Sequence, residues 1–423
     1  MSTENNSSVP TNTPATPRTP NLAERYPALL NHTPIVTQRE MSARRRSIRE
    51  PECGFDVIVR STPPARRVMP TPDVRIINFT NTPSTLSPHY DSKSKTDYLH
   101  QSFSIHGKPL GRGSFAMVAK VESKDDGKMY AIKLGRTYKT KFDRYQQLRE
   151  VVFLQFVSHP NCVRFVSAWE EADRLHIQTE LCEGNLQDYV ELHGGLPEKR
   201  VWEVLLDILH AVVYLHFHRV LHLDIKPENI LLDANGIAKL SDFGLAFDLI
   251  SDDPDDCRIE GDARYLAREA IDDEGERVST KRDIYSLGVT VLQLATDVYL
   301  PPNGDDLQGI RDLNLPDHIL NSMSSELFSL VSKMMSDDPA ARPEAQQILS
   351  TSGVLERGIE RRRFVEAMLP SAAFEDAQRS TDWLRMTLQH IKLEFRSRDY
   401  YQQRVARSCP SVKTPKRPQF APS

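Results

Sequence analysis

The spacing of the apolar residues changes partway along this chain, and that change restricts the fold more than any other feature. From about Phe103, apolar and polar residues alternate in the runs FSIHGKPLG, AMVAKVESK and KMYAIKLG, and the Asp126-Gly127 pair between the last two is a strong hairpin signal. After Gly184 the apolar residues recur at helical spacing, as in VWEVLLDILHAVVYLHF. The pattern predicts an α+β protein in which a small antiparallel-sheet lobe precedes a larger helical lobe.

The N-terminal part of the chain has a different composition. Residues 1–102 are rich in Ser, Thr, Asn and Pro and have few periodic apolar positions. We expect them to be disordered, because they cannot bury enough apolar surface to offset the entropy of ordering. Proline-directed kinases recognise Thr-Pro and Ser-Pro steps, although any tail rich in Thr and Pro contains some by chance. These steps begin at Thr13, Thr16, Thr19, Thr33, Thr62, Thr71, Thr82 and Ser87, and near the other end at Thr414.

The two ends are therefore predicted to be regulatory regions on which upstream proline-directed kinases act. In the C-terminal tail, residues 352–423, the sequence DWLRMTLQHIKLEF would form a short amphipathic helix. Such a helix packs either on a partner or, as is more common for a lone helical stripe, on its own domain.

Cysteine usage and charge restrict the compartment and the partners. The five cysteines are scattered, form no C-x-x-C pair and follow no apolar signal segment, which favours a reducing compartment, cytoplasm or nucleus. A net charge of −4 creates no field that would attract nucleic acid, so no nucleic-acid partner is expected. No apolar run reaches the about 18 residues of a transmembrane span.

A glycine-containing hairpin, LGRGSFAMV, is the first candidate for ligand binding. Glycines at a hairpin tip let backbone N–H groups approach phosphate oxygens. Ala116 occupies the third glycine position of G-x-G-x-x-G, and glycine turns without a ligand are common, so the loop alone leaves both interpretations open. Its strand–turn–strand setting differs from the strand–helix setting of a dinucleotide-binding unit. The candidate nucleotide-binding residues are Leu110, Gly111, Arg112, Gly113, Ser114, Phe115, Ala116, Met117 and Val118.

The strand YAIK supplies the next candidates, Ala131 and Lys133. The ammonium group of Lys133 would hold nucleotide phosphates, and an unpaired Lys at such a position would be costly. Glu150, on the predicted helix that follows, is its natural ion-pair partner; the alternative for this residue is an ordinary solvated Glu.

The segments HLDIKPEN and SDFG contain the residue types that phosphoryl transfer needs. Asp224 would orient a substrate hydroxyl and accept its proton, Lys226 would lie near the transferred phosphoryl group, and Asn229 would offer an oxygen to a metal ion. Asp242 would hold Mg²⁺ that bridges the nucleotide phosphates. The reaction depends mainly on positioning and on neutralising charge, so these residue types are sufficient without a covalent nucleophile. The cofactors expected with them are ATP and Mg²⁺.

In this order the motifs resemble those of the eukaryotic protein kinase family. The resemblance implies a bilobal kinase domain over residues 103–351, with an N-lobe over 103–183 and a C-lobe over 184–351, between disordered tails. It implies that Thr179 lies at the back of the adenine pocket and that backbone groups of Glu180 and Cys182 bind the base. Cys182 is expected to be a buried small hydrophobe, with a reactive thiol as the alternative. Structural polar groups of the large lobe are implied at Asp283, Glu269 and Arg342.

A narrower resemblance comes from LSPHYDSK, SAWEEADRLHIQTELC, KLSDFGLAFDL and EGDARYLA. Together with HLDIKPENI, these segments are similar to the Wee family, and most to its membrane-associated tyrosine- and threonine-specific branch. That implies a cyclin-dependent kinase–cyclin complex as the substrate, phosphorylated on the adjacent Thr and Tyr of its Gly-rich loop to delay mitosis or meiosis. Two alternatives are a general serine/threonine kinase with another substrate and a catalytically silent scaffold that binds a cyclin complex.

Three departures from the kinase pattern carry further expectations. Leu223 replaces the Arg that usually clamps a phosphate of the activation loop, so we expect activity without phosphorylation of that loop. The acidic run SDDPDDC in the same loop is expected to be solvated, with a surface that steers a basic substrate as the alternative. Arg268 stands where the A-P-E motif has Pro, which predicts a local change of loop shape while the Glu269 pair is retained.

The third departure is at the C-terminus: peripheral contact with endoplasmic reticulum or Golgi membrane is implied by the resemblance alone, because the segments after residue 351 are short and charged.

Overall fold

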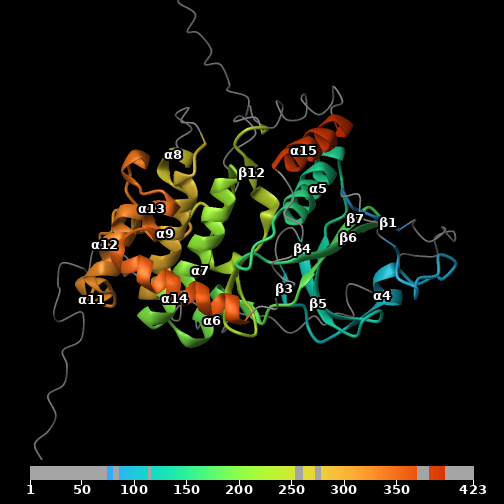
Figure 1. The fold of residues 1–423 in the computed structure, drawn as a ribbon, viewed down its shortest axis with the longest axis horizontal. Helices are drawn as coiled ribbons and strands as arrows, with labels where there is room; N and C mark the ends of the chain where they lie inside the picture. The colour runs from blue at the N-terminus through green and yellow to red at the C-terminus, as the bar shows by residue number, and fades with distance from the viewer. Residues whose placement is uncertain are drawn as a thin grey trace, which may run out of the picture.

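The chain folds into a sheet-rich lobe and a helical lobe (Figure 1). The structure, a computed structural model, describes residues 74–79, 85–112, 116–252, 261–271, 278–368 and 381–395. Within these ranges the predicted α+β fold class is confirmed: an antiparallel sheet is followed by a mostly helical part. The Thr-Pro steps from Thr13 to Thr82 and at Thr414 lie outside the described residues.

The N-lobe is built on a seven-stranded sheet in the order β1-β6-β7-β5-β4-β2, with β3 paired to β4. All of its strand pairs are antiparallel. The hairpin predicted at Asp126-Gly127 joins β4 to β5, with Val118 opposite Lys133. The strands are β1 (Arg75–Ile76), β2 (Phe103–Ile105), β3 (Gly111–Arg112), β4 (Ala116–Ser123), β5 (Met129–Gly135), β6 (Phe165–Glu171) and β7 (Arg174–Glu180).

One long helix, α5 (Lys141–Phe156), packs against this sheet. Its first turn is fixed by a capping box, in which Thr140 accepts from the N–H of Asp143 and the carboxylate of Asp143 accepts from the N–H of Thr140. Tyr145, Leu148 and Val152 are buried in the main core. From Leu148 to Phe156 every residue of α5 is buried, so the helix is enclosed on all sides over this stretch and its polar residues are held inside the lobe.

The short helix α4 (Tyr98–Ser102) closes the other side of the sheet over an aromatic cluster. Trp169 lies between the rings of Phe103 and His176, with centroid distances of 5.7 Å and 5.0 Å. In the segment before α4, Ser87 is only 7% exposed and its hydroxyl donates to Asp125 at 2.6 Å. Unlike a Ser-Pro step in an exposed tail, Ser87 is therefore a buried hydrogen-bonding residue of the folded lobe.

The C-lobe is centred on α7 (Glu198–Phe217) and α9 (Lys281–Thr296), which pack against each other. The apolar stripe predicted on α7 is buried throughout, as Val201, Leu205 and Ile208 are 0% exposed. The other helices are α6 (Leu186–His193), α8 (Arg268–Ile271), α10 (Asp305–Arg311), α11 (Asp317–Leu320), α12 (Ser325–Met334) and α13 (Ala345–Leu349). The segments between these helices contain short strands and single turns of 3-10 helix. The strands are β8 (Gly184–Asn185), β9 (Val220–Leu221), β10 (Ile230–Leu232), β11 (Ala238–Leu240) and β12 (Phe247–Asp248), and the 3-10 helices are η2 (Pro227–Asn229), η3 (Phe243–Leu245) and η5 (Pro339–Ala341).

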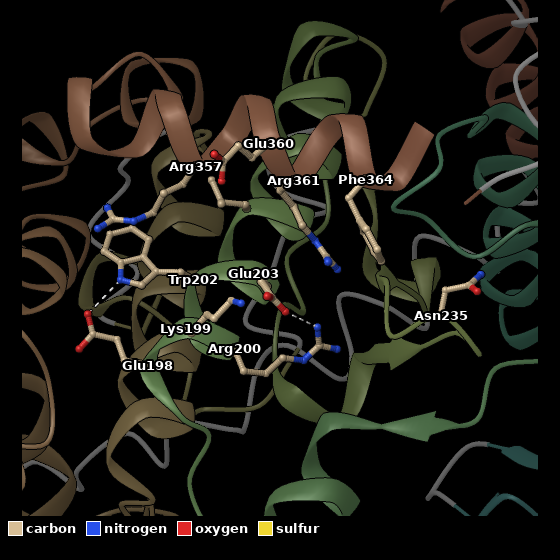
Figure 2. A pocket seen from close by; sticks show the side chains of 11 residues that line it. Glu198, Lys199, Arg200, Trp202, Glu203, Asn235, Arg357, Glu360, Arg361 and Phe364 are labelled. Carbon is tan, nitrogen blue, oxygen red and sulfur yellow. Dashed lines mark hydrogen bonds and ion pairs between the residues drawn. The ribbon is translucent and has the colours of Figure 1, made fainter. Parts of the chain in front are cut away.

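Two helices of the predicted tail pack on the folded lobes. The helix α14 (Ser352–Met368) lies across α7, and α15 (Thr381–Phe395) lies beside α5 (Figure 1). Of the two outcomes expected for DWLRMTLQHIKLEF, the structure shows the contact with the chain's own domain. Between α7 and α14 is a cavity of about 760 Å³, lined by Trp202, Arg361 and Phe364 among others (Figure 2).

Candidate active site

The loop between β9 and η2 brings together the three polar residues of HLDIKPEN. Lys226 Nζ lies 2.9 Å from Asp224 Oδ1. Asn229 Nδ2 donates to Asp224 Oδ2 at 2.7 Å and to the Asp224 carbonyl at 2.9 Å. The side chain of Asp224 is 13% exposed. The structure thus places an acid, a cation and an amide in one hydrogen-bonded group.

A buried carboxylate holds this loop in place. Asp283, on α9, is 0% exposed and accepts from the backbone N–H groups of His222 at 3.0 Å and Leu223 at 2.8 Å. His216 Nε2 lies 2.9 Å from the same carboxylate. Leu223 has a φ of +63°, which is strained for a residue with a Cβ. Hydrogen bonds to the ionised form keep the pKa of Asp283 below its ordinary value despite the burial that opposes them.

Asp242 follows β11 and takes part in a second charged group. Lys133 Nζ lies 2.6 Å from Glu150 Oε1 and 3.0 Å from Asp242 Oδ1. The ion pair expected between Lys133 and Glu150 is therefore present, and Glu150 is not a solvated residue, since its side chain is 9% exposed. Asp242 adopts a left-handed backbone conformation, with φ +61° and ψ 78°, which an Asp tolerates better than most residues.

Burial and charge act against each other in this group. Burial lowers the pKa of Lys133, but the carboxylates of Asp242 and Glu150 outweigh it and hold the pKa above its ordinary value. Burial also disfavours the charged form of Asp242, and Lys133 outweighs it, so the pKa of Asp242 is lowered. Burial raises the pKa of Glu150 against the pull of Lys133. Lys133 and Asp242 are thus held in their charged forms.

His222 links the two groups as a structural residue. Its imidazole is buried and Nε2 donates to the carbonyl of Ser241 at 3.0 Å. Burial lowers the pKa of His222, which favours the neutral ring. Ser241 in turn donates its N–H to the Asn229 carbonyl at 2.9 Å. These hydrogen bonds of His222 and Ser241 therefore connect the loop of Asp224 to the residue before Asp242.

The donor set fits a magnesium ion that is bound together with phosphates. Mg²⁺ is usually held by one or two carboxylates plus substrate phosphates and water. Asp242 lies deep enough in the domain for burial to oppose its charge, yet its side chain is still 43% exposed and offers a carboxylate to a ligand. Asn229 uses its amide nitrogen toward Asp224, so its oxygen is the atom left for a cation. No cluster of three or more His, Cys, Asp or Glu side chains with metal-binding geometry occurs in the described part of the chain.

The tip of the predicted nucleotide loop falls outside the described residues. Gly113, Ser114 and Phe115 are not described, nor is the side chain of Arg112. Gly111 pairs with Val118, and a Cβ built on Gly111 would meet no described atom within 4 Å. Packing within the described structure therefore gives no reason for a glycine here, whereas a bound phosphate would.

The residues implied at the adenine pocket come from neighbouring strands. Thr179 on β7 lies opposite Ala131 on β5. The N–H of Glu180 donates to the Arg164 carbonyl at 3.0 Å, so β7 is anchored up to its last residue. Cys182 is 8% exposed, and burial raises the pKa of its thiol to about 12. Of the two interpretations of Cys182, the structure supports a buried thiol that stays protonated.

The interpretation of the acidic run as solvated was wrong at Asp252, which contacts Arg149 of α5. The acidic run that begins at Ser251 was expected to be solvated, but Asp252 is 8% exposed. Arg149 Nη1 and Nη2 donate to its two carboxylate oxygens at 2.6 Å and 2.7 Å, and Nη2 also donates to the Ala246 carbonyl at 3.0 Å. The signal that the sequence offered was an Arg between Leu148 and Glu150 on the predicted helix, and it was missed because the partner lies 103 residues away. The rest of the run, residues 253–257, lies outside the described residues.

The departure at Arg268 leaves the large-lobe pair intact. Arg342 is 1% exposed and donates to both carboxylate oxygens of Glu269, at 2.6 Å and 2.9 Å. Arg268 itself contacts Asp337 at 3.0 Å and also Asp312. The expected retention of the Glu269 pair is confirmed.

Comparisons with known proteins agree with this geometry. The protein kinase domain family matches residues 105–352. A membrane-associated tyrosine- and threonine-specific cdc2-inhibitory kinase of Caenorhabditis briggsae is 35% identical over 84% of this chain and 53% of its own length. The kinase of the same description from Drosophila melanogaster is 37% identical over 66% of this chain and 52% of its own. A Wee1-like protein kinase of Arabidopsis thaliana is 32% identical over 67% of this chain and 58% of its own.

The chain thus spans about half the length of these first relatives. Among the helices that the structure describes, none combines the length and the apolar character that crossing a bilayer requires.

Proposed function

The chain belongs to the protein kinase family, and its relatives there include cdc2-inhibitory and Wee1-like kinases. We therefore propose that it phosphorylates and inhibits a cyclin-dependent kinase. The observation that carries the proposal is the convergence of two charged groups, Asp224 with Lys226 and Asn229, and Lys133 with Glu150 and Asp242. A silent scaffold has no need to hold these charges together, since each one costs desolvation.

Each side chain has a proposed role. Asp224 would orient the substrate hydroxyl and accept its proton, and Lys226, whose Nζ is 2.9 Å from Asp224 Oδ1, would stabilise the charge of the transferred phosphoryl group. Asn229 and Asp242 would hold Mg²⁺, and Lys133 would bind the phosphates of ATP while Glu150 orients it. When bound, Mg-ATP supplies the phosphoryl group and the divalent charge that neutralises it in transfer. The loop from Leu110 to Val118 would cover the phosphates, and the strand end at Thr179, Glu180 and Cys182 would bind the adenine.

We further propose that the substrate sites are the adjacent Thr and Tyr of the cyclin-dependent kinase's own Gly-rich loop. The relatives' descriptions, tyrosine- and threonine-specific and cdc2-inhibitory, support this. Inhibition would delay the onset of mitosis or meiosis. Cytoplasm or nucleus is the proposed location, and peripheral contact with endoplasmic reticulum or Golgi membrane is supported only by the relatives' description as membrane-associated.

Activity without phosphorylation of the activation loop is part of this proposal. With Leu223 in place of an Arg, that loop position offers no cation to a phosphate. Arg149 instead binds a carboxylate, Asp252, with two hydrogen bonds of 2.6 Å and 2.7 Å. A carboxylate held in this way performs a task for which other kinases use a phosphate.

The test is mass spectrometry of a purified cyclin-dependent kinase–cyclin complex after incubation with this chain and Mg-ATP. We expect phosphate on the adjacent Thr and Tyr of the Gly-rich loop. Lys133→Ala should abolish it, while Lys128→Ala, at a side chain that is 74% exposed, should not. Phosphate only at other positions would favour a general serine/threonine kinase. Inhibition of division that survives Lys133→Ala would favour the scaffold.

A further inference from the structure

The helix α15 contacts α5, although the two are far apart in the chain (Figure 1). We propose that α15 is a positioning helix, which holds α5 and the segment after Asp242 in the arrangement that phosphoryl transfer requires. The inference rests on the proposed kinase activity but not on the identity of the substrate.

The contact is made by one apolar face of α15. Leu384 and Leu388 are 0% and 2% exposed and belong to the same core cluster as Leu148 and Val152 of α5. Met386, between them in sequence, is 70% exposed. Because buried and exposed residues alternate with helical spacing, α15 is seated on the domain by a defined face.

A hydrogen-bond bridge fixes the start of α15. Trp383 Nε1 donates to the Phe79 carbonyl at 3.2 Å. The N–H of Phe79 donates to Gln155 Oε1 of α5 at 3.1 Å. The two helices therefore hold the same short backbone segment from its two polar groups, which restricts how α15 can slide along α5.

A polar contact connects α15 to the segment after Asp242. Asp248 is 0% exposed, and Arg385 Nε lies 3.3 Å from its Oδ2. Among the residues that the structure describes, Arg385 is the only cationic side chain in ion-pair contact with Asp248. Ser251 also donates to this carboxylate, through its N–H at 3.1 Å and its hydroxyl at 2.5 Å. What α15 adds is a cation beside a buried charge, and a buried charge without a cation is costly.

This carboxylate belongs to the same network as Arg149. The N–H of Asp248 donates to Asp252 Oδ2 at 2.8 Å, and Asp252 is the carboxylate that Arg149 binds. Two arginines, one from α5 and one from α15, thus hold two carboxylates of one short segment. In α5, Arg149 directly precedes Glu150, which contacts Lys133 at 2.6 Å. A shift of α15 would therefore reach Lys133 and Asp242 through α5 and through this segment.

The experiment uses the full chain with Leu384→Ser/Leu388→Ser, with Arg385→Gln, and with Met386→Ser as the matched control on the exposed face. ATP hydrolysis is measured well below the melting temperature of each variant, and hydrogen exchange is followed in α5. We expect kcat/KM for ATP to fall by about tenfold in the first two variants while Met386→Ser stays within about twofold. Exchange in α5 should accelerate only in the first two.

A second measurement separates positioning from stability. A peptide of residues 381–395 added to Leu384→Ser/Leu388→Ser should restore hydrolysis in a saturable way, and the same peptide with Arg385→Gln should restore less. Arg385→Lys should recover part of the activity that Arg385→Gln loses, because a cation is retained. Unchanged kcat/KM in folded variants, even with a lower melting temperature, would overturn the proposal and leave α15 as a stabilising contact.

The readout also separates this inference from the substrate proposal. ATP hydrolysis and exchange in α5 need no cyclin-dependent kinase. If the cyclin-dependent kinase is not phosphorylated by the wild-type chain, the proposed substrate fails, while the order of hydrolysis among the α15 variants still tests the positioning role.

Discussion

Replacing Arg361 with Met should destabilise the C-lobe far more than an ordinary change at a helix surface. Arg361 lies on α14, and its Nε and Nη2 donate to Asp207 of α7 at 2.8 Å and 2.6 Å. Both side chains are buried, at 8% and 1% exposure. Asp207 also accepts from the N–H of Ala238 at 2.8 Å. Methionine retains most of the volume of the side chain, so the change removes mainly the charge and its hydrogen bonds.

The magnitude follows from what remains. Arg361→Met leaves a buried carboxylate with one neutral donor, and breaking a buried pair from one side costs about 3–5 kcal/mol. The neighbouring Arg362 forms an exposed pair with Glu366, with side chains 68% and 47% exposed, on the same helix. Arg362→Met should therefore cost at most about 0.5 kcal/mol. The double variant Asp207→Asn/Arg361→Met should cost less than Arg361→Met, because the buried charge is gone.

The assay is equilibrium urea unfolding, followed by tryptophan fluorescence and circular dichroism. Burial already raises the pKa of Asp207 despite the opposing pull of Arg361, and loss of Arg361 raises it further. The folded variant then binds more protons than the unfolded chain, so its free energy of unfolding falls as pH rises through the unfolded pKa of about 4 and toward the raised folded pKa. The deficit relative to wild type should thus be smaller at about pH 5 than at about pH 8. A loss below about 1 kcal/mol, equal to that of Arg362→Met, would refute the reasoning.

Three other perturbations test separate parts of the structure. In α9 a Cβ on Gly288 would lie 2.9 Å from Met335 Cγ and 3.0 Å from Met334 Cβ, so Gly288→Ala should cost about 1–3 kcal/mol in thermal or urea unfolding. Gly309→Ala, in α10 with no described atom within 4 Å, should be neutral or stabilise by up to about 1 kcal/mol, and equal effects would contradict the packing argument. Burial lowers the pKa of His176 to about 4, so the stability that its neutral form contributes is present above the unfolded pKa of about 6.5 and is lost as pH falls toward 4. His176→Phe should reduce that acid-induced loss by about 3 kcal/mol at most, and an unchanged pH profile of unfolding would count against it. Phosphatase treatment should leave ATP hydrolysis within about twofold, whereas Asp252→Asn should lower it, and loss of hydrolysis after phosphatase would show that a phosphate is required.

The alternating and helical patterns were sufficient to predict an antiparallel sheet followed by a helical part, although β1 and α4 lie among the residues that were expected to be disordered. The hairpin at Asp126-Gly127 and the buried stripe of α7 follow from local spacing, which is why both are present. The same holds for the candidate site. Asp224, Lys226 and Asn229 lie within six consecutive residues, so a single loop can bring them together. The contact between Lys133 and Asp242, which are far apart in the chain, depends on the tertiary structure.

Contacts between distant residues could not be predicted in the same way. Ser87 looked like an exposed Ser-Pro step, yet it is buried against Asp125. Asp252 looked like part of a solvated acidic run, yet it is bound by Arg149. In both cases the residue type is compatible with solvent exposure and with burial. Which of the two occurs depends on the residues that the tertiary structure places beside it.

The amino-acid sequence by itself determined the chemistry of this protein, since the acid, cation, amide and glycine positions are set by residue type and by short spacings along the chain. The tertiary structure alone decided how that chemistry is supported. Arg385 and Asp248 are 137 positions apart, and Arg361 and Asp207 are 154 apart. The physical reason is that burying a carboxylate is costly unless a cation lies beside it. The cation reaches the carboxylate only after the apolar residues of α14 or α15 have packed on the domain.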